Sequence, residues 1–170
     1  MLAQQKINAV LNEDLTLREV FEQVASPQHE DAQELTSYWR ERETDGGFVV
    51  GKDIPSRRLA SILRNISLAE PVGNSRNLND LRIRLAGDAF RQRFGRDTGG
   101  ARLSDLFDHD DFEAHITQVG VALHRGAPYI IRCALRRGAV VDKRYEVVVL
   151  PVWSADRTAR WVLTGIFYFA

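Results

Sequence analysis

The stretch from residue 81 to residue 90 reads Leu81-Arg82-Ile83-Arg84-Leu85-Ala86-Gly87-Asp88-Ala89-Phe90. Its first five residues alternate between apolar and basic side chains, a period of two that predicts a strand with one buried face. Gly87 and Asp88 interrupt that period, and the apolar residues between Ala89 and Phe94 then predict a short helix. A strand followed at once by a helix favours a fold that mixes both types of element.

Further strands and helices are predicted on both sides of this stretch. Residues 110–125 place apolar side chains on one helical face, with acidic residues in the first turn, where the helix dipole favours them. Strands are expected at residues 129–136, 144–152 and 161–169, and their short polar connections are typical of antiparallel hairpins. With another strand at residues 66–72, this order predicts an α+β fold whose helices cross one face of a single sheet.

The N-terminal part of the chain has a helical pattern of apolar residues. The first such group recurs at intervals of three and one residues, and it consists of Leu17, Val20, Phe21 and Val24. Ser26 and Pro27 are typical of a second helix start, and an apolar stripe follows them up to Trp39. We therefore expect an N-terminal extension of amphipathic helices over residues 1–45, which serves dimerisation or covers the sheet. Residues 46–170 would form the α+β domain.

The composition limits the class of protein. The 170 residues are enough for one domain with its own core, and 23 basic against 23 acidic residues leave no formal net charge. That balance argues against a protein built mainly to bind nucleic acid. The single cysteine, Cys133, cannot form an internal disulfide, and the sequence shows neither a signal peptide nor an apolar run of membrane-spanning length. We expect a soluble cytoplasmic protein with no membrane partner.

The last two strands are apolar on both faces, so both faces of that half of the sheet need cover. An apolar outer face of this kind usually marks an interaction site. It would pack beneath the N-terminal helices, either of the same chain or of a second copy in a homodimer, and the sequence leaves both possibilities open. The candidate interface residues are Leu17, Val20, Val24, Val148, Leu150, Ile166 and Tyr168.

Two clusters of charged residues offer alternative functions. In the segment His109–His115, pairs of histidine and carboxylate residues lie one helical turn apart and could hold a metal ion or haem in a sensor or enzyme. A solvated helix start explains the same residues, because acidic side chains are favoured there. Arginine-rich segments at residues 82–102 and 132–144 could bind nucleic acid, but aromatic side chains do not interleave with them as stacking platforms would. The sequence therefore requires no metal or cofactor, and nucleic acid is not the expected partner.

The order of motifs resembles a PAS domain, in which a small residue and an aromatic residue follow the second strand and a glycine-led turn enters a short helix. More specifically, the chain resembles the bacterial PAS_5 family over residues 30–168. The segments that carry this resemblance are Tyr38-Trp39, Ile54-Pro55-Ser56-Arg57, Arg82–Phe90, Phe94-Gly95, Gly99–Phe107, Glu146 and Leu150-Pro151. The chain departs from the family at Arg58-Leu59-Ala60-Ser61, where relatives usually carry an acidic, proline-containing run.

The resemblance implies a five-stranded antiparallel sheet with short helices over one face. PAS domains commonly bind a small molecule between the sheet and these helices, or mediate dimerisation. We therefore expect a stand-alone, non-enzymatic sensory or regulatory module of bacterial signalling that contacts an unidentified signalling protein and is tuned by a small ligand. The residues that would line its pocket are Phe90, Phe94, Leu103, Phe107, Ile116 and Cys133. The alternative is that these side chains simply fill the core.

Overall fold

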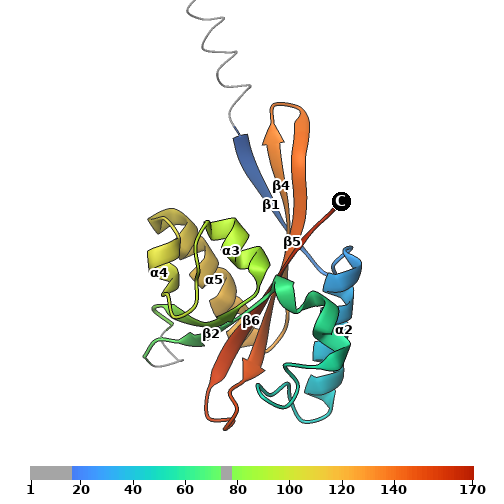
Figure 1. Ribbon diagram of the computed structural model, residues 1–170, viewed down its shortest axis with the longest axis vertical. Coiled ribbons are helices and arrows are strands. Elements are labelled where there is room, and N and C mark those ends of the chain that lie inside the picture. The colour runs from blue at the N-terminus through green and yellow to red at the C-terminus, as the bar shows by residue number, and fades with distance from the viewer. Residues whose placement is uncertain (1–16, 74–77) are drawn as a thin grey trace, which may run out of the picture.

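The structure is a computed structural model that describes residues 17–73 and 78–170. Six antiparallel strands form one sheet in the order β1-β4-β5-β6-β2-β3, with helices on both of its faces (Figure 1). The elements are β1 (Leu17–Val24), α2 (Glu30–Thr44), the 3₁₀ helix η1 (Arg57–Asn65), β2 (Ile66–Pro71), β3 (Leu81–Ala86), α3 (Asp88–Phe94), α4 (Leu103–Leu106), α5 (His109–Arg125), β4 (Tyr129–Arg137), β5 (Val140–Trp153) and β6 (Arg160–Tyr168).

The elements expected after residue 64 are confirmed. Strands β2 and β3 pair with each other, and β4, β5 and β6 follow one another as antiparallel neighbours. Helix α5 begins at His109 and ends at Arg125. The next residue, Gly126, adopts the left-handed conformation (φ 60°) that glycine accommodates without strain. The Asp108 side chain caps the start of this helix by accepting a hydrogen bond from the Asp111 backbone N–H.

The helix expected around residues 17–24 is wrong, because this segment is strand β1 and makes the sheet six-stranded rather than five-stranded. All eight residues of β1 pair with β4, in a register that places Val20 opposite Ala134 and Phe21 opposite Cys133. Val20 and Phe21 remain 49% and 54% exposed at this edge of the sheet. Because neither strand face is fully covered, the sequence lacks the clear alternation that identifies a strand. Residues 1–16, where further helix was expected, lie outside the described part of the chain.

The two sheet faces carry different helices. Helices α3, α4 and α5 cover one face, and α2 and η1 cover the other (Figure 1). The expectation that Val148, Leu150, Ile166 and Tyr168 share an outer face is wrong, because the β5–β6 register pairs Ile166 with Val147 rather than with Val148. Val148 and Leu150 pack completely buried with α2, whereas Ile166 and Tyr168 pack with α3 on the opposite face. Packing within the chain therefore covers most of the proposed interface.

Helix α2 is fixed to the sheet and to the loop that follows it. The indole Nε1 of Trp39 donates a hydrogen bond of 2.7 Å to the Pro151 carbonyl, and the Tyr38 hydroxyl donates one of 2.9 Å to the Asp53 carbonyl. Arg58, which begins the segment that departs from the family pattern, forms ion pairs with two glutamates of α2 and lies over the Tyr38 ring. The helix thus serves as a cover of the sheet, one of the two roles expected for residues 1–45. A separate domain boundary near residue 45 stays a prediction.

Glu146 joins the entrance of α2 to the middle of the sheet. Its side chain is completely buried and accepts hydrogen bonds from the backbone N–H groups of Gln28 and His29, each at 2.9 Å. The Arg132 guanidinium approaches the same carboxylate at 3.2 Å and supplies the opposite charge. A buried carboxylate is tolerated only with such a set of partners, so Glu146 sets where the chain crosses from β1 to α2.

Candidate ligand-binding cavity

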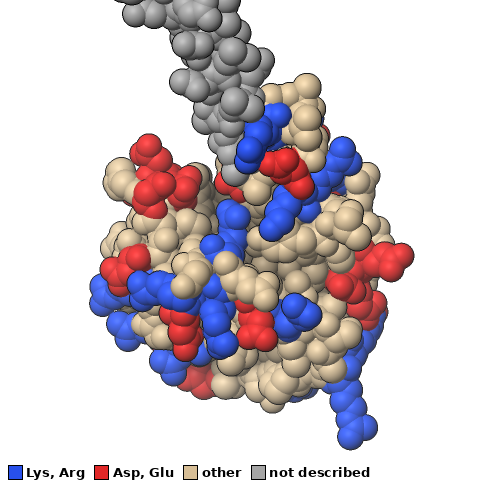
Figure 2. Space-filling view, turned by 45° about the horizontal axis from the view of Figure 1, so that its top comes forward, with Lys and Arg blue, Asp and Glu red and all other residues tan. Residues whose placement is uncertain are grey.

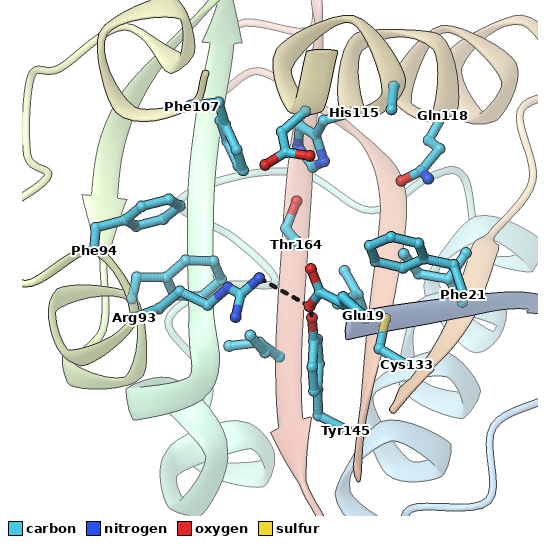
Figure 3. Close-up of a pocket in the computed structure, with 16 residues that line it drawn as sticks. Glu19, Phe21, Arg93, Phe94, Phe107, His115, Gln118, Cys133, Tyr145 and Thr164 are labelled. Atoms are coloured by element: carbon cyan, nitrogen blue, oxygen red, sulfur yellow. Dashed lines mark hydrogen bonds and ion pairs between the residues drawn. The ribbon is translucent and has the colours of Figure 1, made fainter. Parts of the chain in front are cut away.

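A cavity of about 180 Å³ lies between the sheet and the helices α3 and α5. Its floor is formed by β4, β5 and β6, and the edge strand β1 closes one side (Figure 3). The lining residues are Glu19, Phe21, Phe90, Arg93, Phe94, Phe107, Asp111, Ala114, His115, Gln118, Ile131, Cys133, Tyr145, Val147, Thr164 and Ile166. A smaller cavity of about 40 Å³ adjoins it beneath α4 and shares Phe90, Phe94, Phe107, His115 and Thr164.

The helical wall is aromatic because of the spacing within α3 and the turn after α4. Phe90 and Phe94 are four residues apart, so both side chains project from the same side of α3. Phe107 follows directly after α4 and meets Phe94 edge to face, with ring centroids 5.1 Å apart. The His115 ring of α5 stacks on Phe107, with ring centroids 5.3 Å apart. The three rings form a continuous aromatic wall opposite the sheet.

His115 presents a neutral imidazole to the cavity. Burial among apolar groups lowers the pKa of His115 to about 4, because the charged form would lose its hydration. At neutral pH the ring therefore offers one N–H donor and one nitrogen acceptor. Among the described residues it makes no hydrogen bond of its own, so both groups are available to a bound molecule.

A polar cluster from three elements closes the side of the cavity next to β1. The Tyr145 hydroxyl of β5 donates a hydrogen bond to the Glu19 carboxylate of β1, and Arg93 of α3 approaches the same carboxylate at 3.3 Å (Figure 3). The Arg93 guanidinium also lies 5.2 Å from the centre of the Tyr145 ring. These contacts compensate the charges of Glu19 and Arg93 and fasten the edge strand to α3 across the cavity.

The floor of the cavity carries the Thr164 hydroxyl, which lacks a hydrogen-bond partner among the described residues. Thr164 of β6 is only 8% exposed, and within residues 17–73 and 78–170 its hydroxyl makes no hydrogen bond. Figure 3 shows this hydroxyl directed toward the end of the cavity where His115 and Phe107 lie. Because the oxygen opens onto the cavity, it is available to water or to a bound molecule there.

Cys133 contributes an inert sulfur to the floor. It is 1% exposed, and burial together with the nearby Glu19 carboxylate raises the pKa of the Cys133 thiol to about 12. The protonated thiol acts as a small apolar group rather than as a nucleophile. Its place in β4, directly opposite Phe21, leaves it in contact with the cavity but not with bulk solvent.

The structure brings together most of the lining residues expected from the sequence. Phe90, Phe94, Phe107 and Cys133 line the cavity, and Leu103 lines the smaller adjoining one. Ile116 is not among the residues of either cavity, because it points from α5 into the core cluster that contains Val119.

The sequence analysis missed the lining residues Glu19, Phe21, Tyr145 and Thr164. Glu19 and Phe21 were expected in a helix. Tyr145 and Thr164 are ordinary alternating residues of strands, and their neighbours in the cavity are known only once the chain has folded. The one available signal was Thr164 itself, a polar residue inside an otherwise apolar strand.

Two alternative sites were considered from the sequence: a metal or haem site at His109–His115 and an arginine-rich surface for nucleic acid. The described part of the chain does not assemble the residues of either site. His109 is exposed at the start of α5, whereas His115 faces the cavity six residues later. No group of three or more His, Cys, Asp or Glu side chains among the described residues is placed to hold a metal ion. Arginines of the basic segments form ion pairs, including Arg84 with Glu70 and Arg132 with Glu146. Figure 2 shows acidic and basic side chains interspersed on the face that it presents.

A described helix long and apolar enough to cross a membrane is not found.

The antiparallel sheet with helices over a cavity is consistent with a PAS-like fold. The PAS_5 family model, described as a PAS domain, matches residues 27–167, and the chain belongs to this family. This match confirms the resemblance expected from the sequence, and it makes the chain a member of a class whose domains are generally sensory or regulatory modules rather than enzymes. A search of curated proteins found no match.

Proposed function

We propose that this chain is a non-enzymatic PAS module of bacterial signalling that responds to a small molecule in the cavity and acts through protein contacts. The observation that carries the proposal is the aromatic-lined space of about 180 Å³, toward which the Thr164 hydroxyl points without a partner among the described residues. The space is partly open to solvent, so a small molecule can reach it from the surface. An apolar pocket with a few convergent polar groups is typical of a ligand site.

The test is native mass spectrometry of the full chain purified under mild conditions from its bacterial host. The proposal predicts a reproducible added mass of a small organic molecule on the wild-type chain. The variant Thr164→Phe fills the centre of the cavity floor and should lose this mass, whereas Thr158→Phe, a matched change at an exposed residue outside the cavity, should retain it. A wild-type chain without any added mass, or a Thr164→Phe variant that keeps it, would contradict ligand binding at this site.

We also propose that edge strand β1 is the contact surface for a second copy or a signalling partner. The support is the exposure of Val20 on a strand whose outer edge has no neighbour in the described sheet. Unpaired strand edges are templates for pairing with another chain. This surface replaces the outer sheet face first expected, whose residues Val148 and Leu150 are completely buried.

Light scattering after size-exclusion chromatography tests this contact through Val20→Lys. A charged residue at the edge should convert a dimer to a monomer, or abolish capture of the partner. The matched control is Val140→Lys, which changes another exposed valine, 63% exposed, at the first residue of β5 and therefore not on the edge strand. An unchanged assembly in Val20→Lys would exclude this edge as the contact.

The expected compartment is the cytoplasm, where the single thiol of Cys133 would remain reduced.

A further inference from the structure

We infer that the ligand of the cavity is a neutral, single-ring aromatic molecule with one hydroxyl or N–H group, held by Thr164 and His115. This inference rests on the proposed ligand-sensing function and names the chemical class of the ligand. Four features of the cavity carry it: its size, its aromatic wall, the compensation of its charges and its unpartnered polar groups.

The size of the cavity limits the ligand to about one ring. A cavity of about 180 Å³ is slightly larger than an engineered apolar cavity of about 150 Å³ that binds benzene. It therefore accommodates a six-membered ring with one or two small substituents. Flavins and haem are several times larger, so the cavity as observed is too small for either group.

The wall favours a planar ring over an aliphatic chain. Phe94 and Phe107 meet edge to face, and His115 stacks on Phe107 at an interplanar angle of 21°. Phe21 and Phe90 complete the wall from β1 and α3. Aromatic pairs are stabilised beyond the burial of their area when they stack or meet edge to face. A ring that enters this space has several such partners.

The charges in the cavity exclude an anionic ligand. Arg93 is the one permanently cationic side chain in the lining, and Glu19 already compensates it at 3.3 Å. His115 is neutral at pH 7 because burial lowers its pKa to about 4. A carboxylate or phosphate would therefore lose its hydration without gaining an unpaired cation, which is strongly unfavourable in an apolar site. Glu19 is equally committed to Arg93 and Tyr145, so a cationic ligand gains no free counter-charge from it. The second lining carboxylate, Asp111, forms no ion pair among the described residues, but it is exposed, so water screens its attraction for a cation.

The polar groups favour one hydroxyl or N–H on the ring. The Thr164 hydroxyl can donate and accept, and the neutral His115 ring provides one donor and one acceptor. Both side chains face the same end of the cavity in Figure 3. A ligand hydroxyl at that end can donate to one of them and accept from the other, which satisfies groups that otherwise lack a partner among the described residues.

Three probes of nearly equal shape test the inference by isothermal titration calorimetry of the full chain, cleared of any bound molecule by mild extraction. They are p-cresol, p-xylene, which replaces the hydroxyl with a methyl group, and p-toluate, which carries a carboxylate. We expect p-cresol to bind at least tenfold more tightly than p-xylene, and p-toluate to show no binding. An equal or stronger affinity for p-toluate, or equal affinities for p-cresol and p-xylene, would overturn the inference.

The variant Thr164→Val separates the hydroxyl contact from the shape of the cavity. Valine has the shape of threonine without its hydroxyl, so p-xylene should bind as before while the advantage of p-cresol falls to about threefold or less. A full retention of the p-cresol advantage would contradict the role of Thr164. The melting temperatures of the variant and the wild type, compared in the same buffer, show that loss of binding does not come from unfolding.

The outcomes also distinguish the inference from the proposed function. If none of the three probes binds but the purified chain carries another small molecule that Thr164→Phe removes, the sensory function holds and the ligand class is wrong. If no probe binds and no molecule is carried, both are wrong.

Discussion

Replacement of Glu146 by glutamine should lower the free energy of unfolding by about 2–4 kcal/mol. The Glu146 side chain is completely buried, and its two oxygens accept hydrogen bonds from the backbone N–H groups of Gln28 and His29 and from Arg132. Glutamine keeps one accepting oxygen but turns an NH₂ group toward a remaining donor. It also leaves the Arg132 charge unpaired.

The magnitude follows from the partners that are lost. A hydrogen bond to a charged group contributes about 1.5–3 kcal/mol, and removal of one member of a buried ion pair costs about 3–5 kcal/mol. The Arg132 side chain is 27% exposed and can recover part of its hydration, which reduces the second figure. The estimate of about 2–4 kcal/mol lies between these values.

Urea denaturation followed by circular dichroism measures the change. The matched control is Glu22→Gln, which removes the same charge from the same sheet face at an exposed residue and should change the free energy of unfolding by less than about 0.5 kcal/mol. A Glu146→Gln variant within about 1 kcal/mol of the wild type would refute the role assigned to this carboxylate at the entrance of α2.

Two further predictions concern titratable groups of the cavity. Because burial lowers the pKa of His115 to about 4 from its ordinary value of 6.5, the unfolded chain binds a proton at this residue more readily than the native chain as the pH falls through that interval. Between pH 7 and pH 5 the wild type should therefore lose about 1–2 kcal/mol more stability than His115→Gln, in parallel urea titrations; equal losses would contradict a neutral buried imidazole. Because the pKa of the Cys133 thiol is raised to about 12 and the residue is 1% exposed, its reaction with a thiol reagent at pH 8 should be at least about a hundredfold slower in the native chain than in urea. Comparable rates in the two conditions would show that the thiol is accessible.

The sequence pattern was sufficient for elements whose environment is regular along their length. Helix α5 has one apolar face against the sheet, and β3 alternates between buried and exposed residues in its first half, so the period of each is visible in the sequence. The resemblance to PAS domains, rather than any local spacing, placed Phe90, Phe94 and Phe107 in the cavity wall.

The remaining features depend on contacts between distant segments. The apolar residues of β1 fit a helix as well as a strand, and only pairing with β4 decides between the two. The faces of β5 and β6 depend on their register, since a shift of one residue exchanges every side chain between the faces. The Glu19–Tyr145–Arg93 cluster joins three elements that are far apart in the sequence, so no local pattern predicts it.

The most direct test of ligand sensing is a crystal structure of the full chain purified from its native host without added ligands. We predict electron density for a single planar ring between Phe107 and the sheet, with a polar atom within hydrogen-bond distance of the Thr164 hydroxyl and the His115 ring. A cavity that holds only water, or that is closed by repacked side chains, would contradict the central claim that this PAS domain binds a small aromatic molecule there.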